Sequence, residues 1–103
     1  MIWWSSLAFG ADHLALPGAA SPADWREAAS VAGLELGQPG PHDPVVRITA
    51  AGEQWTLRAE DGAGRVRSTT VRAPATAIER EEIAFLAQGL LRDLSAGALP
   101  LAP

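Results

Sequence analysis

The stretch from residue 45 to residue 73 most constrains the fold, because polar and apolar residues alternate along successive short segments. In segments 45–50 and 54–60, apolar side chains occupy every second position. Successive side chains of a β-strand point to opposite faces of a sheet, so this spacing predicts strands with one buried and one wet face. Glycine-bearing turns at 51–53 and 61–64 separate the segments, and such short connections join antiparallel strands. The stretch therefore predicts a three-stranded antiparallel meander.

The third segment, 65–73, does not keep this alternation. Val66 and Val71 stand at positions of opposite parity, so a regular strand cannot point both into one core. A β-bulge near Ser68 and Thr69 would restore a common face, because a bulge inserts one extra residue. Without a bulge, one of the two valines is exposed. The sequence leaves both arrangements open.

Two amphipathic helices are predicted on either side of the meander. Ser21 and Pro22 suit a helix start, and Trp25 leads a stripe of alanines at helical spacing. Before the second helix, Thr76 and Glu79 form the pattern of a capping box, in which each residue satisfies a free backbone N–H group. The apolar face of that helix consists of Ile83, Leu86, Ala87, Leu90, Leu91 and Leu94.

Short apolar segments at 13–16 and 34–36 predict two further strands, and the proline- and glycine-rich stretch 37–44 predicts a loop. The element order is then β-α-β-β-β-β-α. We expect an α+β fold, a two-layer sandwich in which two helices cover one face of an antiparallel sheet of three to five strands. The chain divides into a Trp-rich N-terminal segment at 1–12, a single domain at 13–95 and a C-terminal tail at 96–103.

The layout resembles small periplasmic domains of Gram-negative bacteria, such as the N-terminal domain of TolB and related CsgG-like domains. The residues that carry this resemblance are the meander turn Glu-Asp-Gly-Ala-Gly-Arg-Val at 60–66 and the closing helix at 76–94. The resemblance covers residues 13–95 and includes no signature motif. It implies a non-enzymatic assembly or binding module in the periplasm.

The N-terminal segment contains Trp3 and Trp4 within a short apolar stretch. This stretch resembles a small export signal, although it has no positively charged start. Two interpretations remain: a degenerate signal, or a segment of the mature protein whose tryptophans dock on the domain or contact a partner. No part of the chain approaches the roughly 20 apolar residues of a transmembrane helix. We expect a periplasmic or envelope location over a cytoplasmic one.

The sequence predicts no reaction chemistry. Cysteine is absent, which excludes disulfides, thiolate metal sites and a cysteine nucleophile. The two histidines stand in the pairs Asp12-His13 and His42-Asp43, and adjacent side chains of a strand point apart and do not chelate. We expect surface histidines, no metal site, no cofactor and no enzyme activity.

The charge and its distribution bear on the partner. A net charge of −4 speaks against nucleic acid, because affinity for nucleic acid rests mostly on basic side chains that neutralise phosphates. All basic residues are arginine, and lysine is absent, a composition typical of a bacterial genome with high GC content. Arg47, Arg58 and Arg67, from the basic middle segment, are candidates for binding an anionic ligand. The alternative is that each pairs with an acidic neighbour, which would exclude the anion site.

Ile78 and Phe85 are seven residues apart, so they lie on the same side of the second helix. At about 100° per residue, that side is opposite the apolar face that contains Ile83. Either another part of the chain covers them, or they contact a protein partner or a second copy of the chain.

These features favour a small non-catalytic binding or assembly module that acts through protein–protein contacts. An acidic cytoplasmic regulator of the antitoxin or immunity type and an anion-binding domain remain alternatives.

Overall fold

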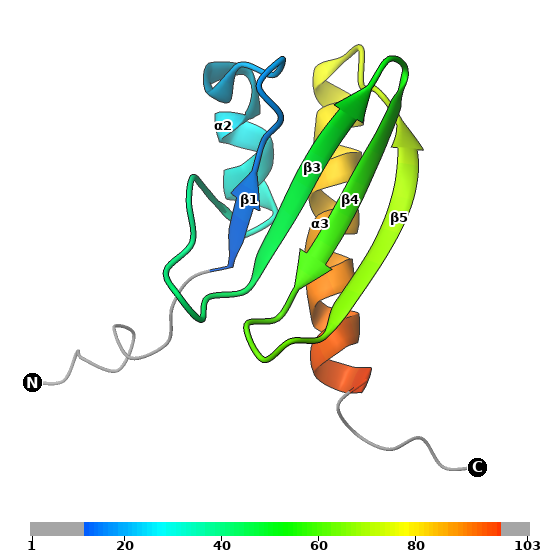
Figure 1. Cartoon of the computed structure of the whole chain (residues 1–103). Helices are drawn as coiled ribbons and strands as arrows, with labels where there is room; N and C mark the ends of the chain where they lie inside the picture. Colours follow the sequence, from blue (N-terminus) through cyan, green and yellow to red (C-terminus); the bar gives the residue numbers. More distant parts are fainter. Residues whose placement is uncertain (1–11, 98–103) are drawn as a thin grey trace, which may run out of the picture.

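The computed structural model describes residues 12–97, which form one mixed sheet and two helices (Figure 1). In chain order, the elements are β1 (His13–Ala15), α2 (Pro22–Val31), β2 (Glu35–Leu36), β3 (Val45–Ala51), β4 (Gln54–Glu60), β5 (Val66–Arg72) and α3 (Ala77–Gly97). The strands lie side by side in the order β2-β1-β3-β4-β5, and both helices lie on the same face of the sheet. The predicted α+β class and element order are confirmed.

The sheet is antiparallel in the meander β3-β4-β5 and parallel around β1. His13 of β1 is in register with Val45 of β3 on one side and with Glu35 of β2 on the other. The sheet is therefore mixed and not antiparallel throughout. The reason is the connection from β1 to β2, since helix α2 carries the chain back to the starting end of the sheet and the next strand pairs in parallel.

Strand β5 contains no bulge. Its register with β4 runs without interruption from Arg72 opposite Gln54 to Val66 opposite Glu60. The parity conflict is resolved by exposure: Val66 is 44% exposed on the sheet face without helices, and Val71 packs against the core. Of the two arrangements that the sequence left open, the exposed valine is therefore the correct one.

The core lies between the sheet and the helices. Trp25 of α2 stacks on Trp55 of β4, with ring centroids 6.0 Å apart and 22° between the ring planes. Around Trp25, α2 buries the small side chains of Ala28 and Ala29, which lets the helix lie close to its neighbours. The rest of the core is Leu14, Ala32, Leu34, Val46, Ile48, Leu57, Ala59, Ile83, Ala84, Ala87, Leu90, Leu91 and Leu94.

The start of α3 follows the predicted capping pattern. The backbone N–H of Glu79 donates to Oγ1 of Thr76 at 3.1 Å, and Oε1 of Glu79 accepts from the backbone N–H of Ala75 at 2.6 Å. At the start of α2, Pro22 takes its expected place, whereas the side chain of Ser21 makes no capping hydrogen bond.

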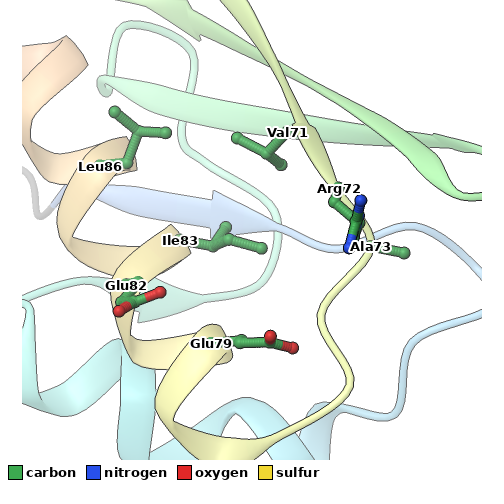
Figure 2. Close-up of a pocket in the computed structure, with 7 residues that line it drawn as sticks. All are labelled: Val71, Arg72, Ala73, Glu79, Glu82, Ile83 and Leu86. Atoms are coloured by element: carbon green, nitrogen blue, oxygen red, sulfur yellow. The ribbon is translucent and has the colours of Figure 1, made fainter.

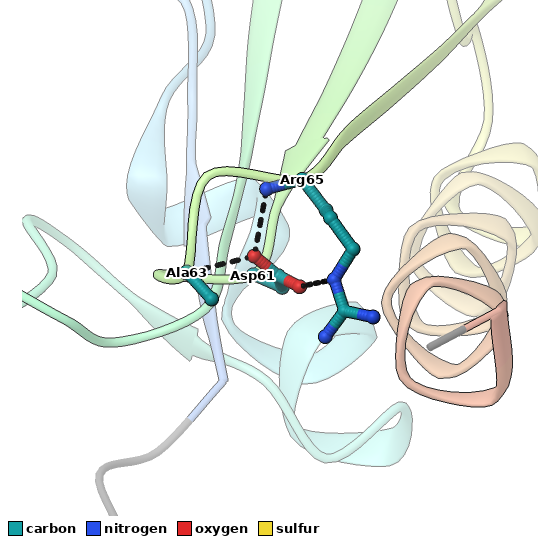
Figure 3. Close-up of polar contacts among 3 residues, drawn as sticks. All are labelled: Asp61, Ala63 and Arg65. Atoms are coloured by element: carbon teal, nitrogen blue, oxygen red, sulfur yellow. Dashed lines mark hydrogen bonds and ion pairs between the residues drawn. The ribbon is translucent and has the colours of Figure 1, made fainter. Parts of the chain in front are cut away.

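The turn between β4 and β5 is organised by the carboxylate of Asp61 (Figure 3). It accepts hydrogen bonds from the backbone N–H groups of Ala63 at 2.8 Å and Arg65 at 3.1 Å, and from Nε of Arg65 at 2.6 Å. These donors favour the ionised form and lower the pKa of Asp61, with the Ala63 N–H as the largest cause. The turn therefore fixes where β5 begins.

The same turn packs tightly against the loop at 37–44. Gly62 has a φ of +82°, and a Cβ placed on it would lie 2.8 Å from the carbonyl carbon of His42. Only glycine combines this left-handed backbone with so close an approach.

Candidate protein-interaction surface

The helix residues that the sequence marked as partner contacts are exposed. Ile78 is 69% and Phe85 is 50% exposed, on the side of α3 turned away from the sheet. No segment within residues 12–97 buries them, so the alternative that another part of this chain covers them does not hold for the described residues. The other two predicted contacts, Trp3 and Trp4, lie outside the described residues.

The three candidate arginines do not share a face. Arg47 and Arg58 are cross-strand neighbours on the open face of the sheet, and both approach Oε2 of Glu60, with their Nε atoms at 3.5 and 3.3 Å. Arg67 is in register with the buried Ala59 and therefore lies on the helix face. The sequence could not place Arg67, because the parity of its strand was unresolved.

Arg67 also has an acidic neighbour, since its Nη1 lies 3.4 Å from Oδ2 of Asp93 in α3. Each of the three arginines is thus paired with an acid. Arg47 and Arg58 share one carboxylate, and the Arg67 pair is exposed, so the anion-binding alternative stays a prediction.

The outer edge of β5 pairs with no strand of the described sheet. The Asp61 and Ala73 N–H groups donate to the carbonyl groups of Arg65 and Glu53 at 3.2 and 2.7 Å, which fixes the phase of the β4-β5 ladder. In an antiparallel ladder, alternate residues point their N–H and C=O groups away from the partner strand. On β5 these outward residues are Val66, Ser68, Thr70 and Arg72.

The two edges of the sheet differ in length. Strand β5 spans seven residues, whereas β2, at the opposite edge, spans two. In Figure 1, α3 runs behind the inner strands and leaves the outer side of β5 uncovered. A long unpaired strand is a template for pairing with another chain.

A groove runs between β5 and α3, beside this free edge. It has a volume of about 280 Å³. Figure 2 shows Val71 of β5 and Leu86 of α3 on opposite sides of the groove, with Ile83 of α3 below them. The carboxylates of Glu79 and Glu82 lie on the α3 wall. The groove therefore has an apolar floor, two carboxylates on its α3 wall and Arg72 on its β5 wall.

Leu86 is the residue that sequence reasoning missed as a surface feature. The helical pattern assigned it to the core face, but it is 39% exposed at the margin of that face, where it lines the groove. The helical angle could have revealed this exposure. Leu86 follows Ile83 by three residues, which places it about 60° around the helix from Ile83 and at the margin of the apolar face.

The histidines lie apart from this surface. His13 is mostly buried, and its Nε2 lies 3.3 Å from Oδ2 of Asp43, which also accepts the backbone N–H of Gly40 at 2.9 Å. The expectation of a surface histidine is therefore wrong for His13, although His42 is exposed. Burial raises the pKa of the neighbouring Asp12. Within residues 12–97, no three potential ligands gather in a way that could hold a metal ion.

Comparison of the chain with protein-family models, with curated proteins and with solved structures found no match. The resemblance to TolB and CsgG-like domains therefore stays a prediction. Neither described helix is long and apolar enough to cross a membrane.

Proposed function

We propose that this chain is a small non-catalytic binding module that holds a protein partner by strand addition at β5. The observation that carries this proposal is the seven-residue edge of β5, which pairs with no other strand within residues 12–97 and presents backbone N–H and C=O groups beside the groove. In strand addition, the main-chain hydrogen bonds supply affinity, and alternate side chains enter pockets that supply specificity. The resemblance to periplasmic domains favours an assembly role in the bacterial envelope.

The apolar side chains on this side of the molecule support the proposal. Leu86 and Val71 line the groove at the edge, and Phe85 follows on the outer face of α3. Exposed large apolar side chains close together are uncommon on a soluble monomer and mark contact surfaces. A bound strand would remove the groove residues from water.

The experiment is capture of the partner by a photo-crosslinker placed at the exposed Ser68 in the native host. The blocking variant is Thr70→Pro, because the Thr70 N–H points outward and proline there removes an edge donor without breaking the ladder to β4. The matched control is Thr49→Ala on the open face.

We expect a defined protein to crosslink in the wild type and the control and to be lost in Thr70→Pro, while circular dichroism of the three proteins agrees. Equal capture by the edge variant and the wild type, or no crosslinked protein at all, would contradict strand addition at β5.

A further inference from the structure

We propose that the partner at β5 is a second copy of this chain, paired antiparallel to β5 about a two-fold axis at Thr69. This inference rests on the proposed function, because it names the occupant of the same edge. Pairing joins two five-stranded sheets into one continuous sheet, with the α3 helices of the two copies on the same face.

The sequence of β5 is complementary to itself in this register. Reversed about Thr69, the strand places Arg67 opposite Val71 of the second copy and Val66 opposite Arg72 of the second copy. Ser68 then faces Thr70, so like charges never stand directly opposite each other, an arrangement that would be destabilising. All seven residues of the strand take part.

The backbone supports the same register. Val66, Ser68, Thr70 and Arg72 have outward-pointing N–H and C=O groups. Pairing about Thr69 matches Val66 with Arg72 and Ser68 with Thr70, so every outward residue meets another outward residue. Such pairs exchange both of their hydrogen bonds in an antiparallel ladder.

Charge complementarity at the groove singles out this occupant. Arg67 lies on the helix face of the sheet, and its position opposite Val71 of the second copy brings it over the groove that Val71 lines. The α3 wall of that groove carries the carboxylates of Glu79 and Glu82, while Arg72 lies on its β5 wall. Each copy therefore extends a guanidinium towards two carboxylates of the other.

Within one copy, Arg67 is held only weakly. Its contact with Asp93 is 3.4 Å long, and both side chains are more than half exposed, so water screens the pair. The carboxylate of Glu82 makes no hydrogen bond or ion pair with another side chain among residues 12–97. Arg67 is thus free to exchange Asp93 for the groove of the second copy.

The test is sedimentation of the full chain over a range of concentrations, with three charge variants and the edge variant Thr70→Pro. The wild type is expected to approach twice its chain mass of 10.8 kDa as concentration rises. Arg67→Glu and Glu82→Arg each place like charges at the groove, and each alone is expected to weaken self-association by roughly tenfold or more. Arg47→Glu makes the same charge change on the open face, away from the edge, and is expected to leave self-association unchanged.

The decisive measurement mixes Arg67→Glu with Glu82→Arg. In a mixed dimer, the carboxylate introduced at position 67 of one variant meets the guanidinium introduced at position 82 of the other. The second contact of the mixed dimer keeps its native charges. The mixture is therefore expected to recover dimers that neither variant forms alone.

Three outcomes would overturn the inference: a wild type that keeps the mass of one chain at roughly millimolar concentration, dimers that persist in Arg67→Glu and Thr70→Pro, or a mixture that stays monomeric. A monomeric wild type that still crosslinks another protein at Ser68 would overturn the second copy as partner and leave strand addition standing. A wild type that stays monomeric and crosslinks no protein at Ser68 would overturn both proposals.

Discussion

Replacing Gly62 with alanine tests the packing of the β4-β5 turn, on which the position of β5 depends. Gly62 has a φ of +82°, and its missing Cβ would lie closer than 3.0 Å to the carbonyl oxygen of His42. Gly52, in the β3-β4 turn, is a matched control, because it has a φ of +63° and nothing within 4 Å of a Cβ. Both glycines have a left-handed backbone, and the main difference between the two substitutions is what the added methyl group meets.

The expected cost follows from these geometries. Alanine in a left-handed conformation costs about 1–2 kcal/mol of stability, and Gly52→Ala should lose about that much. Gly62→Ala carries the same cost and also forces the backbone at His42 to move, which adds about 1–3 kcal/mol, as in an overpacked site. The difference between the two variants should therefore be about 1–3 kcal/mol. For a domain whose stability is about 5–15 kcal/mol, the loss in Gly62→Ala is large.

Urea unfolding followed by tryptophan fluorescence measures both losses, because Trp25 and Trp55 stack in the core. Linear extrapolation gives the free energy of unfolding of each variant in water. Equal losses in Gly62→Ala and Gly52→Ala would refute the close packing of the turn against the loop at 37–44.

Three further changes have calculable effects. Gly89→Ala should stabilise the protein by about 0.5–1 kcal/mol in urea unfolding, because an added Cβ meets nothing within 4 Å and alanine favours helix; a loss would show that Gly89 is crowded. Asp61→Asn should destabilise the protein at neutral pH and have little effect in strong acid, measured as unfolding midpoints across pH. The pKa of Asp61 is lowered in the fold, so its contribution is present above the unfolded pKa of about 3.9 and is lost as pH falls through the folded pKa; a difference that does not change with pH would contradict this. Trp55→Ala should cost about 3–5 kcal/mol and reduce the near-ultraviolet dichroism of the stacked indoles; retention of that signal would argue against the stack.

Local patterns predicted the elements that depend on local physics. Alternation gave β3 and β4, since the buried positions of β4, and those of β3 from Val46 onward, lie two residues apart. The pair Thr76 and Glu79 predicted the start of α3, where the Glu79 N–H donates to the Thr76 side chain. Such signals are contained within a few residues, and they need no knowledge of neighbours in space.

The features that make the candidate surface depend on spatial neighbours. The strand order leaves β5 at an edge, and nothing within its seven residues states this. The register of Arg67 with Ala59 places Arg67 on the helix face. The sequence alone could not assign this face, because nothing in it showed that Val66 is the exposed valine of the strand. Parallel pairing of β1 likewise depends on how α2 crosses the sheet, which no pattern within His13–Ala15 encodes.

The unequal length of the two sheet edges limits how far this protein can assemble. A sheet with two long free edges can pair with further copies at each edge, and repeated pairing forms fibres. Here the far edge is the two-residue strand β2, which offers too little backbone to template another strand. In the proposed dimer, contact at β5 would use the same surface on both copies, so it would occupy the edge from which growth could continue. The fold therefore permits a closed dimer and disfavours growth into a polymer.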